Sequence, residues 1–222
     1  MKKYFLAAIA VSMVSAAHAQ QIATRTQLNG ILGSSTTDDF ETYAPDPGNA
    51  AVIGTTVLDS NTVALGQGPN LVNPGATYTG SDFLQWNDDT YVGLNTRTIL
   101  SNGSTLTIDY AAGVGAMGLD AKVYETYGYA ASFSVYSGAT LLGSTNFSLA
   151  GSGGESVFLG WQSSSSPITK VVLQTTSPIN IYWSPIIDNH TYGKLSSVPE
   201  PASFAILGLG AFAMIRRRKQ TR

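Results

Sequence analysis

The sequence predicts an all-β protein, an antiparallel β-sandwich of the jelly-roll kind, flanked by two apolar terminal segments. Three observations predict this fold class. About ten short runs of β-branched and aromatic residues follow one another, with turn signals at regular spacing. Before the C-terminal tail, no window of eleven or more residues sustains a helical period. The body, residues 20–195, has a length that suits one domain with a hydrophobic core.

The first residues predict a signal peptide over 1–19, in the form of an N-terminal signal helix. Two lysines precede an apolar stretch that ends near Val14, and Ala17 and Ala19 are the small residues that signal peptidase reads. The expected cut lies before Gln20. The alternative interpretation is a first buried helix of the domain.

Alternation of apolar and polar residues predicts the strands of the body. It is clearest from Ser104 to Tyr110, where Leu106, Ile108 and Tyr110 share one face, and Phe133 and Val135 are expected to point inward in the same way. Gly66 to Gly80 is interpreted as a loop and Ala111 to Gly118 as a bend. The other predicted strands are Val52–Leu58, Thr62–Leu65, Phe83–Trp86, Tyr91–Leu94, Ala121–Tyr127, Ala139–Leu142, Asn146–Leu149, Ser156–Trp161, Ile168–Gln174, Ile179–Trp183 and Pro185–Asp188.

The C-terminal segment, 198–222, predicts a single transmembrane helix at about 202–215. This stretch carries no charge, and as a helix it would extend roughly 21 Å, short of a hydrocarbon core of about 30 Å. Basic residues beside an apolar helix stay on the cytoplasmic side, so the body would lie outside. The alternative is an amphipathic helix docked on the body. The cationic cluster consists of Arg216, Arg217, Arg218 and Lys219.

The order of features in this tail resembles the PEP-CTERM sorting signal of exported bacterial proteins. Val198, Pro199, Glu200 and Pro201 come first, then the apolar stretch, then the basic cluster. The resemblance implies recognition by an exosortase, cleavage near Pro-Glu-Pro, and delivery to the cell surface or exopolysaccharide matrix. The body itself looks like the jelly-roll bodies of such proteins, and distantly like carbohydrate-binding modules, in its Asp-Phe-Glu, Phe-Leu-Gly-Trp and Ile-Ile-Asp-Asn motifs.

The charge balance excludes several functions. Two of the twelve cations lie in the signal segment and five in the tail, whereas thirteen of the fourteen acids lie in the body, which has a net charge of about −8. Such a body lacks the basic surface of a nucleic-acid binder. The chain contains no cysteine, which excludes thiol catalysis and thiolate metal centres.

A structural calcium site is the first candidate site. Calcium prefers six to eight oxygen ligands. Asp39 and Glu41 near the start of the body and Asp188 and Asn189 near its end would meet if the terminal strands are neighbours, and the resembled modules carry a calcium at a comparable place. The alternative is that these residues are solvated turn residues.

Carbohydrate binding is the second candidate, because sugar rings stack on flat aromatic faces. At least two of the three tryptophans are expected in the core. Trp86 is the preferred exposed residue, because the turn Asn87-Asp88-Asp89 follows it.

Catalysis finds little support. His190 is the single histidine of the body and is interpreted as a surface residue beside a turn, and no pair of carboxylates stands out as a glycosidase site. The sequence therefore predicts a non-enzymatic, exported surface or matrix protein with a structural or adhesive role. The alternatives are an exopolysaccharide-binding module and, third, a secreted glycan-active enzyme.

Overall fold

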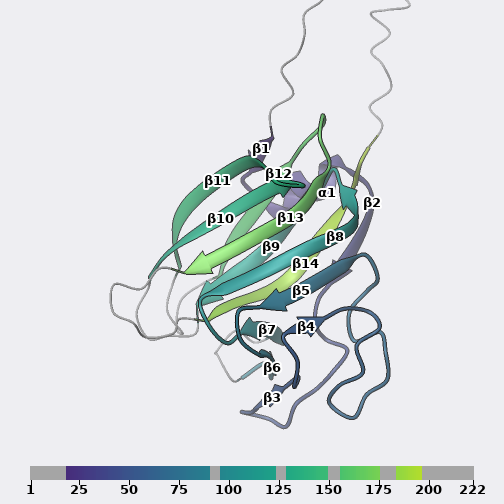
Figure 1. Ribbon diagram of the computed structural model, residues 1–222, viewed down its shortest axis with the longest axis vertical. Helices are drawn as coiled ribbons and strands as arrows, with labels where there is room; N and C mark the ends of the chain where they lie inside the picture. Colours follow the sequence, from purple (N-terminus) through teal and green to yellow (C-terminus); the bar gives the residue numbers. More distant parts are fainter. Residues whose placement is uncertain (1–18, 91–95, 124–128, 150–155, 176–183, 197–222) are drawn as a thin grey trace, which may run out of the picture.

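The computed structural model describes residues 19–196 apart from 91–95, 124–128, 150–155 and 176–183. Within these described residues, two antiparallel sheets and one short helix account for the fold (Figure 1). The elements are β1 (Gln20–Ile22), α1 (Arg25–Ile31), β2 (Leu32–Asp38), β3 (Ala50–Val52), β4 (Val57–Leu58), β5 (Ala76–Gly80), β6 (Leu84–Asn87), β7 (Thr98–Ser101), β8 (Thr105–Val114), β9 (Ala116–Val123), β10 (Tyr129–Ser137), β11 (Thr140–Leu149), β12 (Val157–Gln162), β13 (Ile168–Thr175) and β14 (Pro185–Leu195).

The strand order is that of a jelly roll. Sheet A contains the run β2-β14-β9-β12, and sheet B contains the run β8-β13-β10-β11. Numbered along the chain, these eight strands take the orders 1-8-3-6 and 2-7-4-5, in which successive strands mostly alternate between the sheets. The remaining strands extend the edges: β1 joins β12, the β7-β6-β3 group joins β14, and β5 and β4 join β8. The predicted all-β antiparallel class is confirmed.

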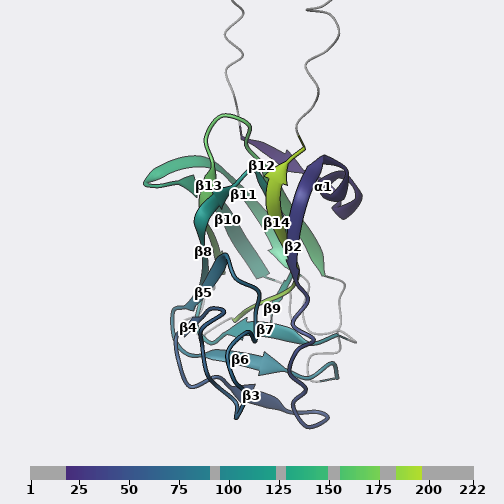
Figure 2. The same cartoon turned by 90° about the vertical axis from the view of Figure 1, so that its right-hand side faces the viewer.

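The hydrophobic core fills the space between the sheets, which Figure 2 shows from the side. Leu106 and Ile108 of β8 and Phe133 and Val135 of β10 are at most 1% exposed, as their alternation predicts. They belong to the same cluster as Leu119, Ala121 and Ile187 of sheet A. Burying side chains of this size contributes about 1.5–3 kcal/mol each, so this layer is the main source of stability.

Helix α1 covers one end of the outer face of sheet A (Figure 2). Thr24 caps it by accepting a hydrogen bond from the Gln27 backbone N–H at 3.2 Å. Leu28 is fully buried against Ile22 and Ala116. The helix approaches closely because Gly118 has no side chain: a Cβ there would lie 2.8 Å from Leu28 Cδ2. Its seven residues make only about two turns, too few to show a sustained helical period in the sequence.

Several predicted boundaries are wrong. Val52–Leu58 is not one strand, because β3 ends at Val52 and β4 begins at Val57. The predicted loop 66–80 contains β5, and the predicted bend 111–118 is almost entirely strand, since β8 passes into β9 across Gly115 alone. Small residues there allow the chain to change sheets without a long loop. The predicted strands 91–94 and 179–183 lie outside the described residues.

Both ends of the body leave from the same end of sheet A. Gln20 pairs with Gln162, Gln162 with Ala116, and Ala116 with Gly193, so these four residues form one row across β1, β12, β9 and β14. Three strand spacings place Gln20 about 14 Å from Gly193. Strand β1 starts at the residue that the predicted signal cleavage would leave first.

The terminal segments themselves, 1–18 and 197–222, lie outside the described residues, and with them the predicted signal helix and the predicted span at 202–215. In the part of the chain that the structure describes, no helix has the length and apolar character needed to cross a bilayer.

Candidate functional site

A bulge in β14 turns consecutive polar residues to opposite sides of sheet A. The register between β14 and β9 shifts between Asp188 and Thr191. Ile187 packs in the core and His190 is also fully buried, although a regular strand would place residues three apart on opposite faces. One extra residue in β14 at the bulge allows Ile187 and His190 to face the same side of the sheet. Asn189 supplies it with a φ of 48°, in the left-handed region that asparagine tolerates better than most residues.

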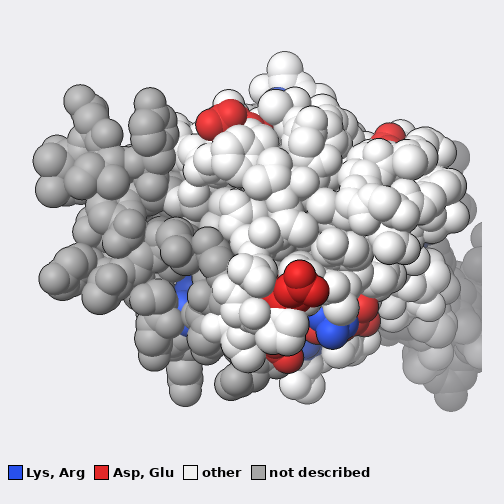
Figure 3. All heavy atoms as spheres, turned by 90° about the horizontal axis from the view of Figure 1, so that it is seen from below, with Lys and Arg blue, Asp and Glu red and all other residues white. Residues whose placement is uncertain are grey.

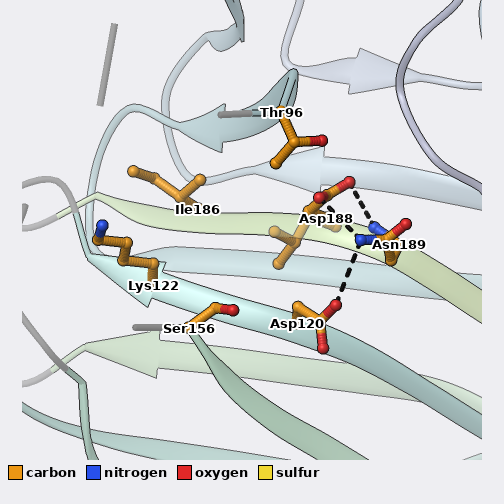
Figure 4. A pocket seen from close by; sticks show the side chains of 8 residues that line it. Thr96, Asp120, Lys122, Ser156, Ile186, Asp188 and Asn189 are labelled. Atoms are coloured by element: carbon orange, nitrogen blue, oxygen red, sulfur yellow. Dashed lines mark hydrogen bonds between the residues drawn. The ribbon is translucent and has the colours of Figure 1, made fainter. Parts of the chain in front are cut away.

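On the outer side, the bulge opens onto a polar pocket of about 220 Å³ (Figure 4). Asp188 and Asn189 of β14 lie beside Asp120 of the neighbouring strand β9, and Asn189 Nδ2 donates to both carboxylates, at 2.9 Å to Asp188 Oδ2 and 3.3 Å to Asp120 Oδ2. We call this the β14 pocket. Its lining consists of Thr96, Asp120, Lys122, Ser156, Ile186, Ile187, Asp188 and Asn189.

Charge in the β14 pocket is only partly balanced. Burial raises the pKa of Asp188 to about 7, and the Asp120 and Glu41 carboxylates add to the effect, while the Asn189 N–H and the Thr96 hydroxyl oppose it. Arg25 of α1 holds Asp120 in an ion pair at 2.9 Å. Lys122 is 1% exposed, burial lowers its pKa, and its side chain extends away from Asp188 in Figure 4. The pocket therefore offers both acceptors and donors to a polar ligand.

On the inner side, His190 joins four residues into a buried network. Its Nδ1 lies 2.7 Å from the Tyr78 hydroxyl and its Nε2 lies 2.9 Å from the Tyr110 hydroxyl, and Tyr78 donates to Asp38 Oδ2. Tyr192 stacks on the imidazole with ring centroids 4.9 Å apart. Burial lowers the pKa of His190 to about 3, so the ring is neutral near pH 7. The expectation of a surface histidine is wrong.

This network contains residue types that are common in catalytic sites, but a substrate cannot reach it. Tyr78 and His190 are fully buried and Asp38 and Tyr110 are at most 4% exposed, so no substrate reaches the imidazole. Both ring nitrogens are already engaged. Its evident effect is to tie β14 of sheet A to β5 and β8 of sheet B.

The predicted calcium ligands are only partly brought together. Asp188 and Asn189 share the β14 pocket. Glu41, in contrast, forms an ion pair with Arg97 at 2.7 Å and accepts from Thr96 Oγ1, while Asp39 Oδ1 accepts from the Glu41 N–H. Among the described residues, no three His, Cys, Asp or Glu side chains form a group that could hold a metal ion. Calcium binding stays a prediction.

The expected exposure of Trp86 is wrong. Its side chain is fully buried, its Nε1 donates to the Phe40 carbonyl at 3.0 Å, and it packs edge-on against Phe40 and Tyr43. The turn after it does not expose it, because β6 lies inside the β7-β6-β3 group and its alternate residues face the core. Trp161 is 7% exposed, so at least two of the three tryptophans are buried as predicted.

Sequence reasoning missed Thr96, Asp120 and Lys122 in the pocket and Asp38, Tyr78 and Tyr110 in the network. Asp120 is an isolated acid in an apolar stretch, and only pairing of β9 with β14 brings it opposite Asp188. The single usable signal is the polar run Asp188-Asn189-His190 after the apolar Ile186 and Ile187, which is typical of a strand interrupted by a bulge.

Beyond the folded body, residues 197–219 match the model of the PEP-CTERM protein-sorting motif. The chain ends in a PEP-CTERM sorting signal. The match includes all eight predicted residues of the signal, namely Val198, Pro199, Glu200, Pro201, Arg216, Arg217, Arg218 and Lys219. The PEP-CTERM motif begins one residue after Ser196, whose N–H donates to the Ile31 carbonyl at 2.8 Å. The folded body and the sorting signal are thus joined directly.

Comparison with solved structures finds carbohydrate-binding modules. A family 29 carbohydrate-binding module is 13% identical over 69% of this chain and 99% of its own, with a TM-score of 0.35. The module CBM36 in complex with calcium and xylotriose is 8% identical over 72% of this chain and 99% of its own, with a TM-score of 0.27. No curated protein matches the chain.

Proposed function

We propose that this chain is an exported surface or matrix protein whose jelly-roll body has a structural or adhesive, non-enzymatic role. The observation that carries the proposal is the direct joining of a jelly-roll body to a PEP-CTERM motif. Strand β14 ends at Leu195, the Ser196 N–H donates to the Ile31 carbonyl, and the motif starts at residue 197. A protein-sorting motif directs the body to its site of delivery. The body therefore acts outside the cytoplasm.

The charge and side-chain chemistry of the body support a role without catalysis. The buried His190 cannot meet a substrate, and Asp120 is paired with Arg25. Charged side chains are few on the face that Figure 3 shows, where the surface is largely uncharged. Such a surface suits weak, repeated contacts with a neutral polymer better than it suits a charged partner such as nucleic acid.

The route that we propose has two processing partners. Signal peptidase would cut before Gln20, and an exosortase-type enzyme would act near Pro199, Glu200 and Pro201 while the segment 202–215 holds the precursor in the membrane. The two ends of the body lie about 14 Å apart in one row of sheet A, so both tethers can hold the body by the same end.

Cell fractionation with mass spectrometry of the mature protein tests the proposal. We expect a surface or matrix form that starts at Gln20 and ends close to Pro199–Pro201, and a membrane-bound precursor when Glu200 is replaced by alanine. Intact chain from Met1 to Arg222 in the cytosolic fraction would refute it. The substitution Glu155→Ala, also an acid-to-alanine change but in the body, is the control.

Binding of a neutral sugar unit at the β14 pocket is a second candidate function. The pocket combines two carboxylates, an amide and two hydroxyls within about 220 Å³, and such groups hydrogen-bond to sugar hydroxyls. The volume lies below the roughly 300–1,000 Å³ of typical small-molecule pockets, which limits the ligand to one ring or a chain end.

Co-sedimentation with the exopolysaccharide of the producing cell tests this second function. We expect binding to weaken about tenfold or more in Asp120→Asn and Asp188→Asn and to persist in Asp109→Asn, which removes one exposed carboxylate from β8 of the other sheet. Equal binding by all three variants would exclude the β14 pocket.

A further inference from the structure

The free edges of the two sheets differ in length. The strands at the ends of the strand orders are β1 and β3 in sheet A, with three residues each, and β4 and β11 in sheet B, with two and ten. Very short edge strands are a usual protection against pairing with other chains. Three of the four ends have this protection, and β11 lacks it.

Strand β2 is a further edge of sheet A, but the chain covers its end. The Asn73 side chain donates to the Thr37 carbonyl at 2.9 Å, and its backbone N–H donates to Asp38 Oδ1 at 2.7 Å. This contact limits the open part of β2 to Leu32–Thr36. Among the described residues, none pairs with the outer edge of β11, whose only strand partner is β10.

Strand β11 also lacks chemical protection. Its sequence Thr-Leu-Leu-Gly-Ser-Thr-Asn-Phe-Ser-Leu contains no charge and no proline, the residues that usually keep an edge solvated. The irregularity in its pairing with β10 is one extra residue of β11, Leu142, because Val135 lies opposite Gly143 and Tyr136 opposite Leu141. Gly143 to Leu149 runs in unbroken register. Leu141 is 54% exposed. Because the body is otherwise acidic, this uncharged strand is where two copies repel each other least.

We propose that β11 pairs with β11 of a second copy of this chain, antiparallel and about a two-fold axis, so that sheet B continues from one copy into the next. An isologous contact of this kind needs one self-complementary surface, and an antiparallel strand pair provides it. Ser144, Asn146 and Ser148 are exposed and alternate with the half-buried Thr145 and Phe147, so the continued sheet keeps a polar outer face. The Ser134–Ser144 hydroxyl contact at 3.1 Å is the first member of that row.

The absence of cysteine makes a direct test possible, because one introduced cysteine is the only thiol in the whole chain. In the purified full-length protein in mild detergent, the exposed residues Leu141, Ser144, Asn146 and Ser148 are replaced by cysteine one at a time and oxidised. In such a pair, a residue two positions from the axis lies four positions along the strand from the same residue of the second copy, a distance of about 13 Å. Only cysteines close to the axis can therefore form a disulfide with each other. We expect a disulfide-linked dimer whose yield peaks inside the strand and falls on both sides.

The control is Val63→Cys, because this side chain is 71% exposed and lies outside every strand. Dimer yields along β11 no higher than that of Val63→Cys would overturn the proposal. A disulfide adduct whose mass identifies a different protein would show that β11 pairs with a strand of that protein and not with a second copy. This result would also overturn the proposal.

Light scattering on the same full-length protein gives a second, independent measurement. Asn146→Lys places a positive charge in the uncharged strand β11 of each copy, and we expect the dimer dissociation constant to rise at least tenfold. Asn146→Gln and Thr107→Lys, the latter within sheet B away from its edge, should leave it unchanged. A dissociation constant that Asn146→Lys does not move, with unfolding unaffected, would contradict the proposal.

Discussion

The two sides of the β14 bulge are the most instructive pair of regions in this molecule. Asp188 and His190 are two residues apart, yet Asp188 faces the outer β14 pocket and His190 lies in the core between Tyr78 and Tyr110. The outer side leaves a carboxyl group with two acidic neighbours, whereas the inner side satisfies every polar atom of the imidazole. One strand therefore holds a carboxyl group that lines a pocket and an imidazole that is purely structural, and a single extra residue separates them.

The largest expected difference between the two sides is in stability. His190→Ala removes the partner of two buried tyrosine hydroxyls and leaves a cavity, so we expect the free energy of unfolding to fall by about 3–5 kcal/mol. Asp188→Ala on the outer side should cost less than about 1 kcal/mol, because it removes a carboxylate that burial disfavours. Urea unfolding measures both, and equal losses would show that the bulge does not separate the two roles.

Asp188 and His190 should also contribute to the pH dependence of stability with opposite signs. The folded pKa of Asp188, about 7, lies above its ordinary value, so stability falls as pH rises from about 4 to 7. The folded pKa of His190, about 3, lies below its ordinary value, so stability rises from about pH 3 to 6.5. In the intact protein these two contributions oppose each other.

Replacing one of the two residues allows the pH dependence of stability due to the other to be measured. We expect the stability of Asp188→Asn to rise between pH 4 and 6.5 through His190, by less than the roughly 1.4 kcal/mol per pH unit that one proton contributes, because Asp38 acts in the opposite direction. We expect the stability of His190→Gln to fall over the same range through Asp188, with Asp38, whose pKa burial also raises, adding to the fall. Denaturant midpoints at several pH values measure this, and parallel profiles in both variants would be the contrary result.

The bulge itself should be sensitive to the residue at position 189. Asn189→Val forces a β-branched residue to a φ of 48°, so we expect a loss of about 1–3 kcal/mol. Asn189→Gly relieves the backbone but removes the amide contacts to both carboxylates, and we expect a change below about 1 kcal/mol. Thermal unfolding compares the two variants, and a Val variant as stable as the Gly variant would argue against a strained bulge.

The smallest effect that we predict concerns calcium. If a calcium ion binds at Asp188 and Asn189, millimolar calcium raises the melting temperature by a few degrees, and Asp188→Ala removes the shift. Asp39→Ala removes it too if Asp39 contributes, although its carboxylate now caps the Glu41 N–H. Magnesium is the control ion, and a melting temperature that calcium does not move would exclude the site.

Local patterns anticipated much of the fold and little of the pocket. The alternation from Leu106 to Tyr110 and at Phe133 and Val135 correctly marked inward faces, because a regular strand buries every second residue. Trp86 was misplaced, because burial of a side chain beside a turn depends on which strands flank its own. The predicted end of the last strand at Asp188 was seven residues too early, because a bulge looks like a turn in sequence.

Local sequence patterns are sufficient to predict an acidic, cysteine-free body of alternating strands. They also predict the C-terminal sorting motif, because its order of proline, apolar and basic residues does not depend on a fold. The surroundings of individual polar residues, in contrast, depend on the folded arrangement of the strands. His190 meets Tyr78 and Tyr110 across 112 and 80 positions of the chain. Burial, partners and pKa arise from such long-range neighbours, and no local window contains them.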